Sequence, residues 1–143
     1  MPVVDASLLV ALALDDRRAP AVEDLMLRWT RDDEAMHAPV LIRYEVASGL
    51  TRAAAAGAIG VGQVSEAWSA VLGLPVTYHA LENGPAVVDI ALDLARRSAY
   101  DAAYLALAVN LRSELWTFDA RLVRNAGRLG YPVRLVEVGG QPE

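Results

Sequence analysis

The sequence alternates between short runs of apolar, often β-branched residues and longer stretches with helical periodicity. Five of the short runs have the length and composition of buried strands; they lie near residues 3–5, 36–38, 75–78, 115–118 and 133–136. The stretches between them repeat apolar residues at helical spacing, as at 8–14, 40–56 and 102–111. Strands that alternate with helices form parallel sheets between helix layers. The chain is therefore predicted to adopt an α/β fold.

The bulk properties indicate one compact domain. The 143 residues are 55% hydrophobic, with a mean hydropathy of +0.27, and we expect a single domain over 1–138 with a frayed tail at 139–143. No apolar run reaches the roughly 18 residues of a membrane span. The N-terminus has no basic region ahead of an apolar one, so no signal peptide is expected. These features predict a cytoplasmic protein, and the lack of Cys excludes disulfides and thiolate metal sites.

Four acids are predicted to meet at one edge of the sheet. Asp5 and Asp119 each follow a strand directly, which places them at the carboxyl edge, where such folds bind ligands. Asp101 is in the first turn of a helix that precedes a strand, and that turn lies at the same edge. Glu45 is in the second turn of the helix after the strand at 36–38. Connectivity brings all four to one rim, but it does not determine which are neighbours.

Each acid also has an ordinary interpretation. Asp is a favoured helix N-cap, Ser98-x-x-Asp101 resembles a capping box, and Glu45 could be solvated. Against this, Asp101 sits in an apolar run and Asp5 adjoins a buried strand, where an unpartnered carboxylate is costly. No basic residue is expected among the four acids at this edge, so together they need a cation to balance their negative charge. The net charge of −5 argues against nucleic-acid binding, but the rest of the chain is nearly neutral if these acids hold metal.

Four segments resemble the signatures of PIN-domain ribonucleases, specifically VapC-type toxins. They occur in the family's order and at its typical spacing over nearly the whole chain, and the third, with its YDAAYLALA run, is the most distinctive. The segments are Val4-Asp5-Ala6-Ser7, Pro39 to Glu45, Ser98 to Ala108 and Thr117-Phe118-Asp119-Ala120-Arg121-Leu122.

This resemblance implies a three-layer α/β/α sandwich around a parallel sheet of about five strands. It also implies an endoribonuclease that depends on Mg²⁺ or Mn²⁺, usually a dimer, with a cognate antitoxin that blocks the acidic pocket. The implied catalytic and metal-binding residues are Asp5, Glu45, Asp101 and Asp119, with Asp5 and Asp101 as direct ligands. Ser7 and Thr117 are candidate supporting residues, although each is also a common residue at its position.

Other interpretations stay open on the sequence alone. One is a catalytically silent PIN-like interaction module, and another is an aspartyl-phosphate phosphatase or receiver domain. The latter is disfavoured because Ser7 replaces the second acid of Asp-x-Asp and the chain has no Lys. Cleavage of DNA is not excluded. His37 and His79 are expected to be structural. Several arginines could guide RNA or simply be solvated; they are Arg17, Arg18, Arg96, Arg97 and Arg121.

Overall fold

A computed structural model describes residues 1–96 and 98–139 and contains one five-stranded sheet. The strands are β1 (Val3–Val4), β2 (Met36–Pro39), β3 (Val76–His79), β4 (Leu115–Thr117) and β5 (Val133–Leu135). Every pairing is parallel, and the strand order is β3-β2-β1-β4-β5. The predicted parallel sheet of about five strands is therefore confirmed.

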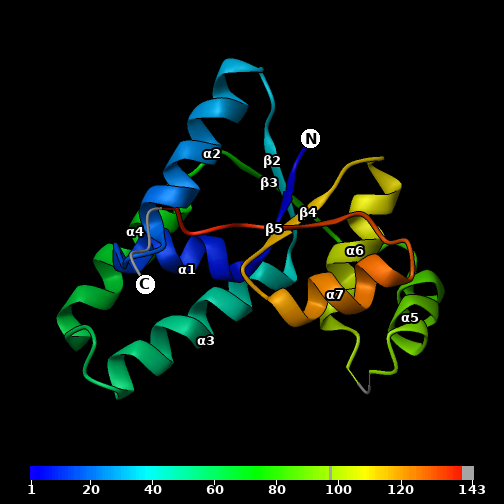
Figure 1. Cartoon of the computed structure of the whole chain (residues 1–143). Coiled ribbons are helices and arrows are strands. Elements are labelled where there is room, and N and C mark those ends of the chain that lie inside the picture. The colour runs from blue at the N-terminus through cyan, green and yellow to red at the C-terminus, as the bar shows by residue number, and fades with distance from the viewer. Residues whose placement is uncertain (97, 140–143) are drawn as a thin grey trace.

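Helices cover both faces of this sheet. They are α1 (Ala6–Leu14), α2 (Ala19–Arg31), α3 (Leu41–Ala55), the short 3₁₀ helix η1 (Val61–Gln63), α4 (Val64–Leu72), α5 (Gly84–Asp93), α6 (Tyr100–Asn110) and α7 (Ala120–Arg128). α1 packs against α2, α3 and α4, whereas α6 packs against β1, β2, β4 and α5. Figure 1 shows α1 to α4 on one side of the strands and α5 to α7 on the other. The three-layer α/β/α arrangement is confirmed.

The winding of the chain reverses between β1 and β4. From β1 the chain moves outward to β2 and β3, and then returns through α5 and α6 to β4 on the opposite side of β1. Right-handed crossovers in opposite directions put their helices on opposite faces. Val3 pairs with Leu115 and Val4 with Trp116. The carboxyl ends of β1 and β4 are therefore neighbours at a topological switch point, where open α/β sheets bind ligands.

The main disagreements with the expected boundaries are local. The helix expected from Pro85 to Arg97 ends at Asp93, and Ala95 adopts a left-handed conformation with φ of 55°. The Ser98-x-x-Asp101 capping box is not formed, because Ala99 is the N-cap of α6 and has no side-chain cap. Arg97 and residues 140–143, most of the expected frayed tail, lie outside the described residues.

The core explains why the central strands read as apolar runs. Val3 and Val4 of β1 and Leu115 of β4 have no exposed surface, because helices cover both faces of the sheet. Ile42 from α3 and Leu105 from α6 are equally buried, one on each side. In the described residues, no helix is long and apolar enough to cross a membrane.

A close approach of α1 and α3 shapes the carboxyl edge. A Cβ atom added at Gly49 of α3 would lie 2.7 Å from Cγ2 of Val10 of α1. Val10 is β-branched and has one preferred rotamer in a helix, so it cannot easily move aside. Gly49 is therefore required by the packing of these two helices.

We predict that Gly49→Ala lowers the free energy of unfolding by about 1–2 kcal/mol, because overpacking outweighs the gain in helix propensity. Gly127→Ala is the matched control. Gly127 lies inside α7, and a Cβ there would meet only an ordinary contact of 4.0 Å with Val133. The control should be neutral or slightly stabilising in urea denaturation. Equal effects of the two substitutions would contradict this account.

Candidate active site

A cavity of about 450 Å³ opens at the carboxyl edge, beside the ends of β1 and β4. Its lining includes all four acids predicted from the sequence, which are Asp5, Glu45, Asp101 and Asp119. Asp5 follows β1, Asp119 follows β4, and the other two come from α3 and α6 on opposite faces of the sheet. The structure thus shows that the four acids lie around one cavity, which the order of elements along the chain could not establish.

Asp5 accepts hydrogen bonds from the first turn of α1 and from the end of β4. Its Oδ1 accepts hydrogen bonds from the backbone N–H of Ser7, at 2.9 Å, and from the Ser7 hydroxyl, while Oδ2 accepts one from the Thr117 hydroxyl. Thr117 is completely buried, and its Oγ1 accepts the N–H of Asp119 at 3.0 Å. The two residues predicted to support the site, Ser7 and Thr117, therefore both contact Asp5.

Burial dominates the electrostatics of Asp5. It raises the pKa of this carboxyl from 3.8 to about 6, even though the hydrogen bonds from Ser7 and Thr117 act in the opposite direction. The negative charge of Glu45 adds to the upward shift. The site without a bound cation therefore resists ionisation of its central carboxyl group.

Glu45 is positioned by Tyr104, a residue that the sequence analysis did not identify as functional. The Tyr104 hydroxyl donates a hydrogen bond to Oε1 of Glu45 at 2.5 Å, and the side chain is only 2% exposed. Burial, then this hydrogen bond, raises the pKa of Tyr104, so the phenol stays protonated and acts as a donor. Tyr104 lies three residues after Asp101 on α6, and this spacing puts both on one helix face. This spacing is the sequence signal that could have identified Tyr104 as part of the site.

Asp101 and Asp119 face the cavity from the starts of two helices. Burial raises the pKa of Asp101, Arg96 opposes the shift, and the charge of Asp119 adds to it. Asp119 is the N-cap of α7, and its Oδ1 accepts the N–H of Leu122 at 3.1 Å. Asp5 likewise caps α1. The capping interpretation is thus correct for both, and each nevertheless lines the cavity.

The expectation that no basic residue lies among the acids is wrong. Arg18, from the loop between α1 and α2, and Arg52, from the last turn of α3, both line the cavity. The sequence already indicated Arg18 as a possible RNA contact, and Arg52 lies two turns after Glu45 on α3. The tertiary fold adds that both line the cavity. His37 and His79 approach each other across β2 and β3, with Nδ1 and Nε2 at 2.8 Å. These histidines do not line the cavity.

The donor set fits a hard divalent cation. Carboxylate and hydroxyl oxygens are the ligands that Mg²⁺ and Mn²⁺ prefer. Over residues 1–96 and 98–139, no three acid or histidine side chains are placed as a ready cage for one ion. Hydrogen bonds to Ser7, Thr117 and Tyr104 occupy part of the carboxylate surface. Mg²⁺ binds through one or two carboxylates and keeps several waters, so this set suits a partly hydrated ion.

Residues 3–128 match the model of the PIN domain family. The chain belongs to this family. It is 35% identical over 137 residues to Ribonuclease VapC9 of Mycobacterium tuberculosis, which covers 95% of this chain and 98% of that protein. It is 38% identical over 123 residues to Ribonuclease VapC3 of the same organism, covering 85% of each chain. This PIN domain is thus of the VapC type, as its four signature segments predicted.

The fold is also similar to a solved structure. The crystal structure of PAE2754 from Pyrobaculum aerophilum superposes with a TM-score of 0.66 and 24% sequence identity, over 87% of this chain and 78% of that one. The family match leaves no support for the receiver or aspartyl-phosphate interpretation.

The raised pKa of Asp5 leads to a prediction about stability in metal-free buffer. Between about pH 4 and pH 6 the folded state retains a proton that the unfolded state has lost, so stability falls as the pH rises through this window. The loss reaches about 3 kcal/mol at most, from a shift of roughly two pKa units. Asp5→Asn cannot ionise and should be more stable than wild type above pH 6.

Urea denaturation of wild type and Asp5→Asn across pH 4–8, with a chelator present, measures this difference directly. Asp89→Asn, the same substitution on an exposed residue of α5, is the matched control for the exchange itself. Parallel pH profiles for wild type and Asp5→Asn would show that Asp5 ionises normally in the folded protein.

Proposed function

We propose that this PIN domain is a divalent-metal-dependent endoribonuclease that hydrolyses RNA phosphodiester bonds in the cytoplasm, as the toxin of a toxin–antitoxin pair. The observation that carries the proposal is the convergence of Asp5, Glu45, Asp101 and Asp119 on one cavity. The relatives that match most of this chain are ribonucleases by name. A cavity lined by four carboxylates is suited to phosphate chemistry assisted by a bound cation.

The residues divide into ligands and supports. Asp5 and Asp101 are assigned as direct ligands of Mg²⁺ or Mn²⁺, and Asp119 and Glu45 as ligands that bind directly or through water. Such an ion, when bound, supplies a charge that neutralises phosphate and lowers the pKa of a water molecule. Ser7 and Thr117 fix the orientation of the Asp5 carboxylate, and Tyr104 fixes that of Glu45.

Two apolar surfaces are suited to binding protein partners. The groove between α3, η1 and α4, of about 570 Å³, is lined mainly by apolar residues such as Leu50, Val64 and Trp68. An apolar groove of this kind suits a segment of the antitoxin. On α5, Val88 and Leu92 are 51% and 69% exposed and lie one turn apart. This stripe suits a second copy of the chain, which supports a homodimer.

Mapping of cleavage sites across total cellular RNA tests the proposed activity. We predict that Asp101→Asn lowers the rate of cleavage at least 100-fold, about the scale expected when one group that stabilises developing charge is removed. Asp89→Asn, on the exposed face of α5, should cut the same sites at the wild-type rate. If Asp101→Asn cuts as wild type does, the cavity is not the active site, and a silent interaction module becomes the better interpretation.

Metal binding has its own test by thermal melting. Mn²⁺ binds only the folded cavity, so a concentration 100 times its dissociation constant should stabilise the wild type by about 2.7 kcal/mol. Asp5→Asn should abolish most of this shift, and Asp89→Asn should retain it. A wild-type melting temperature that does not respond to millimolar Mn²⁺ would contradict the metal assignment.

A further inference from the structure

Arg18 is held rigidly at the rim of the cavity by Asp16. Its Nε lies 3.3 Å from both oxygens of Asp16, its Nη2 lies 2.8 Å from Oδ2, and its backbone N–H donates to Oδ1 at 2.8 Å. Burial tends to raise the pKa of Asp16, but the hydrogen bonds and charge of Arg18 outweigh it and hold that pKa below its ordinary value. Asp16 therefore remains ionised, and the pair stays intact at neutral pH.

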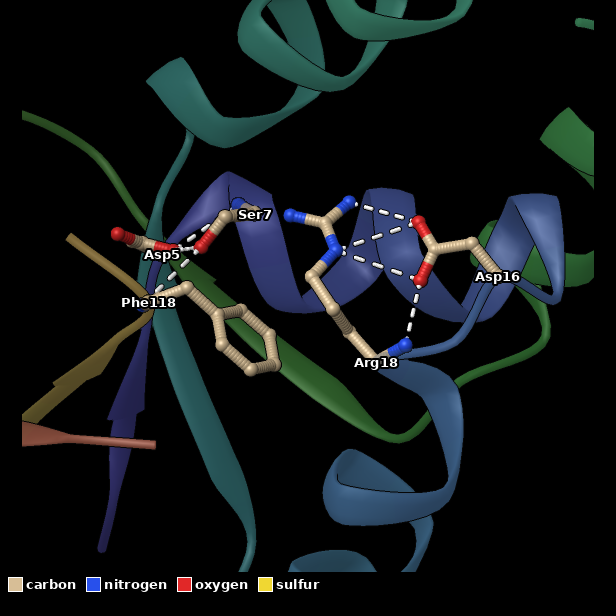
Figure 2. Close-up of polar contacts among 5 residues, drawn as sticks. All are labelled: Asp5, Ser7, Asp16, Arg18 and Phe118. Carbon is tan, nitrogen blue, oxygen red and sulfur yellow. Dashed lines mark hydrogen bonds and ion pairs between the residues drawn. The ribbon is translucent and has the colours of Figure 1, made fainter. Parts of the chain in front are cut away.

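The guanidinium of Arg18 also lies over the ring of Phe118. Its central carbon is 5.2 Å from the ring centroid, within cation–π range. The backbone N–H of Phe118 is 3.5 Å from Oγ of Ser7, and Ser7 in turn bonds Asp5. Figure 2 shows this chain of contacts from Asp16 to Asp5. Arg18 is thus fixed relative to the carboxylate that the proposed mechanism depends on.

One edge of the Arg18 guanidinium remains open. Across the part of the chain that the structure describes, Asp16 is the only ion-pair partner of Arg18 and Nη1 makes no hydrogen bond. In Figure 2 this nitrogen points away from Asp16 and toward Ser7. Arg18 is half-buried and lines the same cavity as the four acids. A fixed, planar cation with free N–H donors is the group that best binds a phosphate oxygen.

We propose that Arg18, held by Asp16 and stacked on Phe118, binds a backbone phosphate of the RNA strand at the rim of the cavity. This inference rests on the proposed ribonuclease function. The positive charge of Arg18 offsets the repulsion between RNA and the four carboxylates. The contact between Arg18 and the phosphate also holds the RNA strand at a fixed distance from Asp5. Preorganisation by Asp16 and Phe118 reduces the side-chain entropy lost when RNA binds.

The chain contains a matched control for this arrangement. Arg134 pairs with Glu114, with Nε 2.7 Å from Oε2, and lies 5.8 Å from the ring centroid of Trp116. Arg134 therefore has the same kinds of partner as Arg18, an acid and an aromatic residue. It does not line the cavity. A general effect of losing one surface Arg should appear equally in both positions.

Binding of a fluorescein-labelled, mixed-sequence, single-stranded RNA of about 20 nucleotides tests the proposal. The binding measurements use Asp101→Asn as the parent, so that the RNA stays intact, and fluorescence anisotropy gives Kd over a range of NaCl concentrations. Loss of one phosphate contact should reduce the slope of log K against log salt by about 0.7, which is about fivefold in affinity near 0.1 M salt. We expect this change for Arg18→Gln and none for Arg134→Gln.

The conservative variant separates charge from geometry. Arg18→Lys should restore the salt slope, because it keeps the charge, but only part of the affinity, because it lacks the planar fork. With Asp101 restored, Arg18→Gln should raise KM about fivefold, following the affinity, and leave kcat within about twofold. A melting temperature equal to that of the parent shows that the fold is intact.

The outcomes distinguish this inference from the function on which it rests. An unchanged salt slope in Arg18→Gln, with RNA bound by the parent, overturns the role of Arg18 alone. A fall in kcat with unchanged KM does the same, because it indicates a structural effect on the acids. If the wild type neither binds nor cuts RNA, the proposed function fails, and the role of Arg18 fails with it.

Discussion

The pairing of β1 with β4 is the constraint on which the site depends. The backbone N–H of Asp5 bonds the carbonyl of Trp116 at 3.2 Å, and the Thr117 hydroxyl reaches the Asp5 carboxylate. These contacts join residues more than a hundred positions apart in the chain. They supply a buried carboxylate with the donors without which its burial would be prohibitively costly. The α/β winding is what brings the two strand ends together, because its direction reverses between them.

Hydrogen-bond partners of their own hold Asp5, Glu45 and Asp119 in the cavity. Asp5 is bonded by two hydroxyls, Glu45 by the Tyr104 phenol, and Asp119 by the start of α7. These donors hold the carboxylates in place without neutralising them. Burial first, and the neighbouring acids second, keep the pKa values of Asp5 and Asp101 above their ordinary values. A divalent cation would offset both the burial of these charges and their mutual repulsion, so metal binding and stability should be coupled.

The first turns of helices have two roles in this fold. Asp5 and Asp119 satisfy free N–H groups at the starts of α1 and α7, and the same side chains line the cavity. Capping and ligand binding are compatible because a carboxylate has two oxygens with several lone pairs. An ordinary structural explanation for an acid is therefore no argument against a functional one at the carboxyl edge of a parallel sheet.

The alternation of strands and helices, the parallel sheet and the four acids at its carboxyl edge were predictable from the sequence, because they follow from local periodicity and chain direction. The predicted helix ends were also close to the observed ones, except that α5 ends early, at Asp93. Strand order, and with it the adjacency of Asp5 and Thr117, became visible in the three-dimensional structure alone. So did Tyr104 beside Glu45 and Arg18 over Phe118. Contacts of this kind depend on how helices pack across a sheet, and no short window of sequence records that packing.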